Sequence, residues 1–130
     1  MALPWNEQAS GEFTGTDENR GDEDRMGKFK AAFMFVTPDS DPKIHRTSLS
    51  TPEVLDLVIV GVRDYDQAAQ VARELVDQGI TAIELCGGFG QIGVAKVAEA
   101  VGDRAFVGVV RFDRHPGLGY KSGDELFVKK

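Results

Sequence analysis

The residues from Glu84 to Gly90 bring together a carboxylate, the only thiol of the chain and three glycines. Residues 80–86 are rich in β-branched side chains and predict a strand, and residues 91–101 predict a helix. A strand that ends in a glycine turn before a helix leaves backbone N–H groups free to hold an anion. We therefore expect the turn at residues 87–90 to bind a negatively charged group.

A second segment, residues 111–124, mixes charged side chains with turn-forming glycines and a proline. Arg111 or Lys121 would hold a carboxylate or phosphate, and His115 or Asp113 would move a proton. The alternative is a surface loop in which Asp and Arg side chains pair with each other.

Two residues of the first segment each admit two interpretations. Glu84 is either a general base or a structural carboxylate paired with Arg111 or Lys30. Cys86 is either a nucleophile activated by the helix that follows or a small apolar filler at the end of a buried strand.

Two further kinds of site find little support in the sequence. His45, His115, Cys86 and Asp113 match no zinc spacing, and neither G-x-G-x-x-G nor G-K-[ST] occurs, so we expect no metal and no cofactor. The expected catalytic residues are Glu84, His115 and Asp113, and the expected ligand-binding residues are Cys86, Gly87, Gly88, Phe89, Gly90, Arg111, Lys121 and Ser122.

The elements that must position these residues follow from hydrophobic periodicity and turn signals. The order is β-β-α-β-α-β, and residues 37–53 are expected to be mainly loop. Asp64 or Asp66 can cap the first helix. The expected strands are Lys28–Val36, Val54–Val62, Ile80–Cys86 and Ala105–Phe112, with a short Glu125–Val128 strand, and the expected helices are Tyr65–Gln78 and Gln91–Val101.

Helical crossovers make the strands mainly parallel, so the chain is expected to be a small α/β domain. The carboxyl ends of such strands meet at one edge, where open α/β sheets bind ligands. Two helices cover mainly one face of the sheet. We therefore expect a homo-oligomer in which the uncovered face packs on a second copy.

The charge of the chain is unevenly distributed. The net charge is −6, and seven acidic and two basic side chains lie in residues 1–26. We expect residues 1–27 to be a disordered acidic tail, either solvated or a docking arm using Trp5 and Phe13, and residues 28–130 to be one domain. Without a basic surplus or a long apolar run, neither nucleic acid nor membrane is an expected partner, and we expect the protein in the cytoplasm.

Three blocks of sequence resemble a family of small, functionally uncharacterised microbial proteins, a domain of unknown function. The likeness covers about residues 28–127 and implies a single domain with no established activity. Two positions depart from the family pattern: Tyr120 stands where glycine is usual, and Arg114 where a second histidine is common. The blocks are Lys28–Val36, Ala82–Gly90, and His115–Gly119 followed by Lys121–Asp124.

A looser likeness links residues 54–112 to half of an aldolase-type (β/α) barrel. In such barrels a strand ending in Ile-Glu-Leu places a glutamate for proton transfer, which matches Glu84 in position. The predicted parallel strands contain no lysine for a Schiff base, so aldolase chemistry is not implied.

Two functions fit these residues. The first is a small-molecule-binding protein, with acid–base chemistry on a carboxylate- or carbonyl-bearing metabolite, in which the ligand is anionic. The second is a non-enzymatic, oligomeric ligand-binding or assembly module. A solvent-connected pocket containing Glu84 and His115 would favour the enzyme, whereas burial of both loops against a partner would favour the module.

Overall fold

The computed structural model describes residues 27–129. The segment expected to be a disordered acidic tail therefore lies outside the described residues, apart from Gly27.

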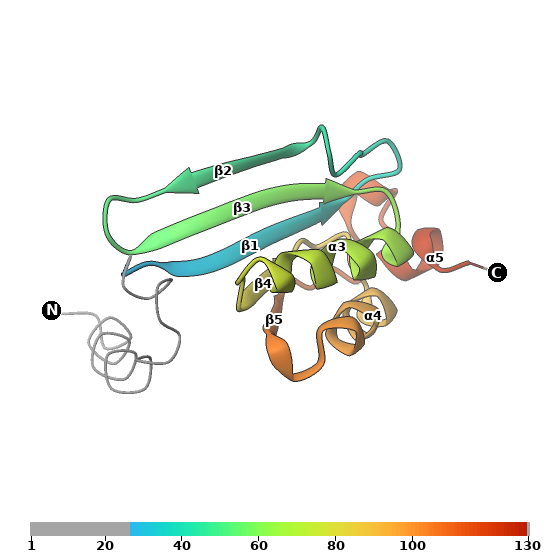
Figure 1. Ribbon diagram of the computed structural model, residues 1–130. Coiled ribbons are helices and arrows are strands. Elements are labelled where there is room, and N and C mark those ends of the chain that lie inside the picture. The colour runs from blue at the N-terminus through green and yellow to red at the C-terminus, as the bar shows by residue number, and fades with distance from the viewer. Residues whose placement is uncertain (1–26, 130) are drawn as a thin grey trace, which may run out of the picture.

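Five strands form one sheet in the order β2-β3-β1-β4-β5 (Figure 1). Every neighbouring pair is parallel except β2 and β3, which are antiparallel. The carboxyl ends of four strands therefore lie at one edge. The strands are β1 (Phe29–Val36), β2 (Arg46–Ser50), β3 (Leu55–Val62), β4 (Ala82–Leu85) and β5 (Phe106–Val109).

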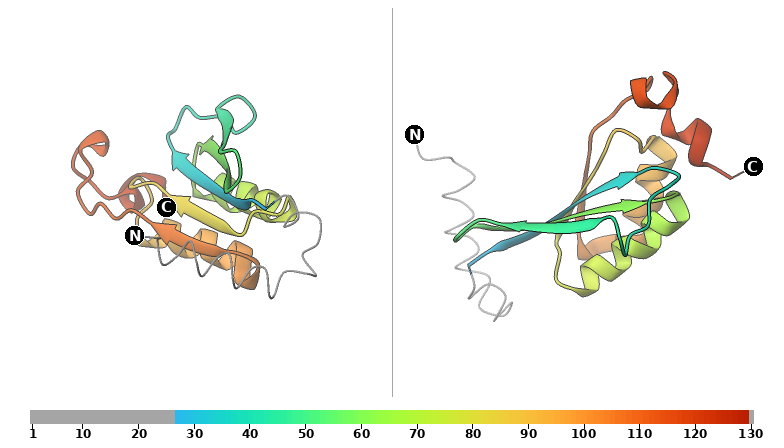
Figure 2. Two further views of the ribbon diagram at one scale, coloured as in Figure 1. Left: turned by 90° about the vertical axis from the view of Figure 1, so that its left-hand side faces the viewer. Right: turned by 90° about the horizontal axis from the view of Figure 1, so that it is seen from above.

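Three α-helices accompany the sheet: α3 (Tyr65–Asp77), α4 (Gln91–Val101) and the short α5 (Gly123–Phe127). Single 3₁₀ turns occupy Gly102–Arg104 and Pro116–Leu118. The Asp64 carboxylate caps α3 by accepting from the Gln67 N–H at 2.8 Å. Helices α3 and α4 pack together on the same side of the sheet (Figure 2).

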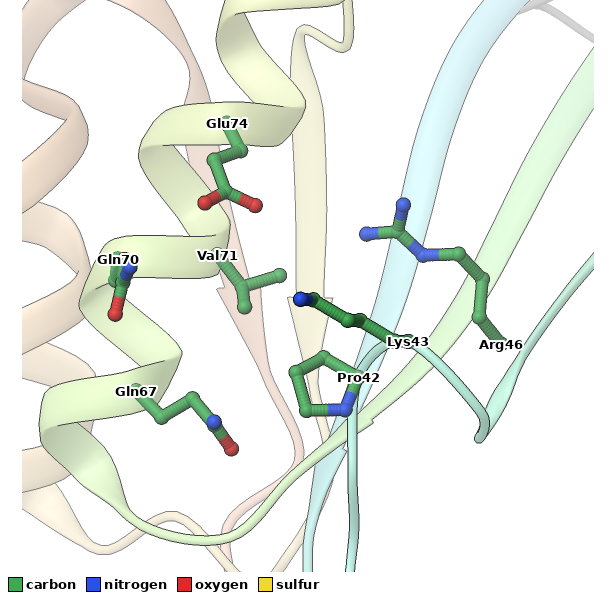
Figure 3. A pocket seen from close by; sticks show the side chains of 7 residues that line it. All are labelled: Pro42, Lys43, Arg46, Gln67, Gln70, Val71 and Glu74. Atoms are coloured by element: carbon green, nitrogen blue, oxygen red, sulfur yellow. The ribbon is translucent and has the colours of Figure 1, made fainter.

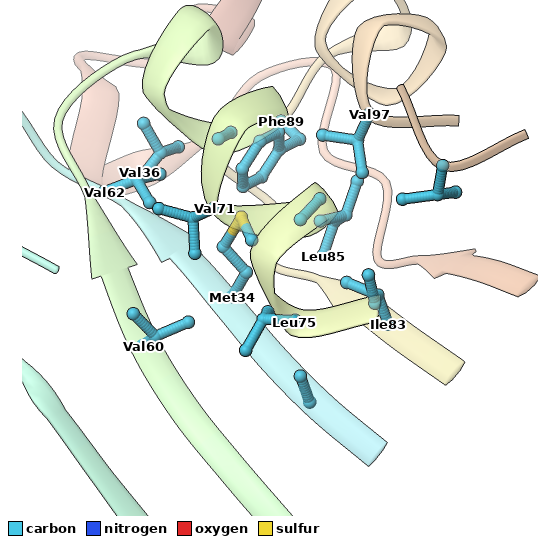
Figure 4. Packing of buried hydrophobic residues seen from close by; sticks show 14 of the residues in the cluster. Met34, Val36, Val60, Val62, Val71, Leu75, Ile83, Leu85, Phe89 and Val97 are labelled. Atoms are coloured by element: carbon cyan, nitrogen blue, oxygen red, sulfur yellow. The ribbon is translucent and has the colours of Figure 1, made fainter. Parts of the chain in front are cut away.

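The core lies between this side of the sheet and the two long helices (Figure 4). Alternate strand residues point toward the helices, as a period of two requires. Strands β1, β3 and β4 contribute Ala32, Met34, Val36, Val60, Val62, Ile83 and Leu85, and helices α3 and α4 contribute Ala68, Val71, Ala72, Leu75, Val97 and Val101.

No helix within residues 27–129 packs on the opposite side of the sheet, which we call the open face. Its residues are mostly apolar, and several of them are exposed: Leu49 is 59% and Phe106 is 82% exposed, whereas Ala31 is buried. The pairing register assigns to this face Phe29, Ala31, Phe33 and Phe35 of β1, Thr47 and Leu49 of β2, Leu55, Leu57, Ile59 and Gly61 of β3, Ala82 and Glu84 of β4, and Phe106 and Gly108 of β5.

The predicted fold class is confirmed: the chain is an α/β domain with a mainly parallel sheet and its long helices on one face. Two details of the prediction are wrong: residues 46–50 form a strand rather than loop, and residues 123–127 form a helix where a strand was expected over residues 125–128. The sheet places β1 between β3 and β4, a spatial order that the sequence did not predict.

Each difference has a physical reason. Strand β2 is an edge strand that pairs only with β3, and all of its side chains are exposed. Its sequence therefore lacks the alternation of apolar and polar residues by which a strand is predicted. The helix α5 is started by a capping box, in which the Ser122 hydroxyl accepts from the Asp124 N–H and the Glu125 carboxylate accepts from the Ser122 N–H.

Within residues 27–129, no helix is long and apolar enough to cross a membrane.

Candidate functional site

The two segments singled out by their chemistry meet at the carboxyl end of β4. The ring of His115 packs against Phe112 with centroids 4.8 Å apart. Both rings lie directly over Gly87, where an added Cβ would collide with Phe112 and approach His115 within 3.2 Å. The loop after β5 therefore covers the turn after β4.

A buried tyrosine joins this region to the helices. The Tyr65 side chain is 2% exposed and stacks on Phe89, with ring centroids 5.6 Å apart. Its hydroxyl accepts a hydrogen bond from the Gly90 N–H at 2.9 Å and donates one to the Asp124 carboxylate at 3.0 Å. One phenol thus links the first turn of α3, the start of α4 and the start of α5.

The Asp124 carboxylate occupies the N-terminus of α4. Its oxygens accept from the N–H groups of Ile92 at 3.0 Å and Gly93 at 3.3 Å. The cap residue Gly90 has no side chain to satisfy these donors, so Asp124 supplies the cap, from 31 residues beyond Gly93. The anion expected at this helix start is therefore a side chain of the protein itself.

The glycines of both segments permit this close approach. A Cβ on Gly123 would overlap the carbonyl oxygen of Gly88, and a Cβ on Gly90 would collide with the Asp124 carboxyl group. The space beside the turn is therefore filled by backbone and by Asp124.

Electrostatics favour the neutral phenol. Burial raises the pKa of Tyr65 well above its ordinary value, and the neighbouring Asp124 carboxylate adds to the rise, while the bond from Gly90 acts against it. Tyr65 consequently serves as a fixed hydrogen-bond donor to Asp124.

The remaining predicted ligand groups are held by local contacts. The Cys86 sulfur accepts from the Gly88 N–H at 3.2 Å, and the thiol is half-buried against the core. Ser122 is engaged in the capping of α5. Lys121 is exposed, and its carbonyl accepts from the His115 N–H at 3.0 Å.

The predicted proton-transfer residues do not share one environment. His115 is half-buried, and its Nδ1 accepts from the Gly117 N–H at 2.9 Å. Glu84 is exposed on the open face, because its neighbours Ile83 and Leu85 point into the core. It therefore lies on the side of β4 that faces away from the helices.

Asp113 and Arg111 form the surface pair that the alternative interpretation described. The Arg111 Nε lies 2.8 Å from a carboxylate oxygen of Asp113, and both side chains are mostly exposed. This contact raises the pKa of Arg111. In the described part of the chain, neither Arg111 nor Lys30 forms an ion pair with Glu84.

A hollow lies at the other half of the same sheet edge, between α3 and the connection from β1 to β2 (Figure 3). Its volume is about 390 Å³, within the range of small-molecule sites. Lys43 and Arg46 approach it from the connection and from β2. The complete lining is Pro42, Lys43, Arg46, Gln67, Gln70, Val71 and Glu74.

The connection that carries the two cations is held by local hydrogen bonds. An Asp41 carboxylate oxygen accepts from the Lys43 N–H at 2.9 Å, and the His45 Nδ1 accepts from the Asp41 N–H at 2.9 Å. On the helix, Gln67 accepts from the Arg63 N–H at 2.8 Å, which orients its amide beside the hollow.

No three His, Cys, Asp or Glu side chains within residues 27–129 lie close enough together to hold a metal ion.

Sequence reasoning missed the most connected residues of the region, Tyr65 and Asp124, and also the hollow. One local signal was present: Ser122 followed three residues later by Glu125 is a capping-box pattern that predicts a helix start. A second, weaker signal was Tyr65, a large aromatic residue directly after the helix cap Asp64, at a position that can point into the core.

A family model described as a family of unknown function (DUF6506) matches residues 29–125, and the chain belongs to this family. No curated protein matches the chain. No solved structure matches it either.

Replacing Asp124 with alanine should lower the free energy of unfolding by about 1–3 kcal/mol, because it leaves the start of α4 uncapped and the buried Tyr65 hydroxyl without its acceptor. Urea unfolding followed by circular dichroism measures the change. Asp103→Ala removes a carboxylate from an exposed turn and should change stability by less than about 0.5 kcal/mol. Equal effects of the two substitutions would contradict the capping role.

Stability should fall as the pH rises above about 10, the ordinary pKa of a tyrosine. The folded-state pKa of Tyr65 is raised, so its contribution is complete below the unfolded-state value and is lost above it. In a Tyr120→Phe variant, which leaves Tyr65 as the only tyrosine, phenolate absorbance should appear only together with loss of the circular dichroism signal. Ionisation of Tyr65 in a still folded protein near pH 10 would contradict its burial.

Proposed function

We propose that this protein binds a small anionic metabolite, one that carries a carboxylate or a phosphate, in the hollow between α3 and the β1–β2 connection. The observation that carries the proposal is the pair of cations, Lys43 and Arg46, that line it. Within residues 27–129, neither cation lies within 4.0 Å of a carboxylate. A negatively charged ligand would supply the missing partner.

The other lining residues suit a ligand with a polar end and an apolar body. Gln67 and Gln70 offer amide donors and acceptors, and Pro42 and Val71 offer apolar contact. Glu74 is the only acidic residue of the lining. The hollow thus carries a net positive charge, which favours an anion and leaves one carboxylate to accept from a ligand hydroxyl or amine.

The position agrees with general rules for α/β sheets. The connection begins where β1 ends, and Gln67 lies in the first turn of the helix that follows β3. Ligands of open α/β sheets bind beyond the carboxyl ends of the strands. The turn after β4 lies at the same edge, but its helix start is already bound to Asp124.

The acid–base reaction predicted from the sequence requires Glu84 and His115 at the ligand, and neither residue lines this hollow. A proton-transfer role for those two residues stays a prediction.

Titration with inorganic phosphate and with citrate, monitored by amide chemical shifts in NMR spectra, tests the site. Shifts should concentrate in residues 42–46 and in the first three turns of α3. Lys43→Gln and Arg46→Gln should each weaken binding about 10- to 100-fold, the size of a lost charge-assisted hydrogen bond.

The matched control is Arg73→Gln, which removes one positive charge from an exposed position of α3 that does not line the hollow. It should leave the affinity within about twofold, because surface charges act weakly at a distance in salt. Absence of binding by both probes, or equal weakening by Arg73→Gln, would refute the site.

A further inference from the structure

The open face of the sheet is organised in two rows that cross the strands. The first row, from β2 to β5, is Leu49, Leu57, Ala31, Ala82 and Phe106. All five side chains are apolar, and its two ends are largely exposed, at 59% for Leu49 and 82% for Phe106.

The second row runs beside the first and contains Thr47, Ile59, Phe33, Glu84 and Gly108. Ile59 and Phe33 are only half-buried although they lie on interior strands. In the same strands, the residues that point to the helices, Met34 and Val60, have no exposed surface. The helices fully bury the side chains that point toward them, whereas the side chains of the open face in these strands stay partly exposed to solvent.

We propose that a second copy of this chain covers the open face over β2, β3, β1 and β4, in a two-fold symmetric dimer whose axis runs between β1 and β3, parallel to the strands, which leaves β5 with Phe106 at the rim of the interface. Such an axis lays β1 of one copy on β3 of the other, and β2 of one copy on β4 of the other. Because the axis is parallel to the strands, the first row of one copy faces the first row of the other, and the second row faces the second. The two sheets then pack about 10 Å apart as a sandwich.

The sizes of the side chains in the first row are self-complementary under this symmetry. Leu57 lies opposite the second copy's Ala31, and Leu49 lies opposite the second copy's Ala82. Each large side chain therefore meets a small one, which fills space without overlap. An isologous dimer requires this kind of self-match.

The second row places the polar groups of the face together. Glu84 lies opposite the second copy's Thr47, whose hydroxyl can donate to the carboxylate, and Phe33 lies opposite the second copy's Ile59. Glu84 is the only ionisable residue of the open face. A carboxylate buried in an apolar interface needs such a donor, and the symmetry supplies it twice.

The extent of the face suits a dimer. Strands β1 and β3 have eight residues each, β2 has five and β4 has four, so at about 3.3 Å per residue and about 4.8 Å between strands the plane area is roughly 400 Å² per copy. Stable interfaces bury about 800 Å² of accessible surface per partner. The accessible surface of a sheet face is larger than its plane area, because side chains project from it. With one carboxylate and no cation, the face offers little to a charged partner such as nucleic acid.

Sedimentation equilibrium of the full chain at micromolar concentration should give about twice the chain mass of 14.1 kDa. Leu49→Lys should give the monomer mass, because it places an unpaired charge in the interface. Ile44→Lys adds the same charge at a 70% exposed position outside the open face and should leave the dimer intact. A monomeric wild-type chain would overturn the proposal. That result would also be expected if residues 1–26, rather than a second copy, covered the face.

An exchange of the polar pair tests the symmetry axis. Thr47→Glu, at an exposed position of the edge strand, should dissociate the dimer, because each new carboxylate would lie opposite Glu84 of the second copy. Adding Glu84→Thr should restore the dimer mass. A dimer that persists in Thr47→Glu, or that fails to return in the exchanged variant, would overturn the arrangement.

These results are separate from those of the anion site, because Arg46 pairs with Val60 and so points to the helix side of the sheet. Circular dichroism of each variant distinguishes loss of the dimer from loss of folding, and phosphate titration of a folded monomeric variant still tests the hollow.

Discussion

The arrangement around the carboxyl end of β4 depends on one buried hydroxyl. The Tyr65 phenol lies between the Gly90 N–H and the Asp124 carboxylate, and the carboxylate in turn caps α4. A buried hydroxyl without partners is costly, so the two helix starts must stay within hydrogen-bond reach of Tyr65. This constraint fixes where the loop after β5 lies, and the loop covers the turn after β4 through Phe112 and His115.

The same contacts give the two glycine-rich segments a structural role at the starts of α4 and α5. Both segments have the composition of ligand loops. Their glycines, however, allow close approach of the backbone, and the Asp124 carboxylate of the second segment occupies the anion position at the start of α4. The cations at the other half of the edge, Lys43 and Arg46, form no ion pair among the described residues, which is why we propose the ligand site there. On the other side of the sheet, we propose that a second copy of the chain packs on the open face.

The sequence was sufficient for elements with strong periodicity and insufficient for contacts between distant residues. The apolar stripe of α3 and its cap Asp64, and the nearly continuous apolar run of β3, were readable locally. Strand β2 was not readable, because its five side chains are all exposed. The insertion of β1 between β3 and β4 follows from no connection rule, and the bond from Tyr65 to Asp124 joins residues 59 positions apart. The loop after β5 does meet the turn after β4, but the role of the space between them depended on one contact that no local pattern encodes.

A double-mutant cycle with Tyr65→Phe and Asp124→Ala tests the central claim most directly. Equilibrium urea unfolding of the four proteins gives the coupling free energy between the two side chains. If the phenol and the carboxylate form one junction, each single substitution destabilises the fold and the double variant loses less than their sum, by about 0.5–3 kcal/mol. Losses that add to within about 0.3 kcal/mol would show that the two residues act independently and would contradict the account.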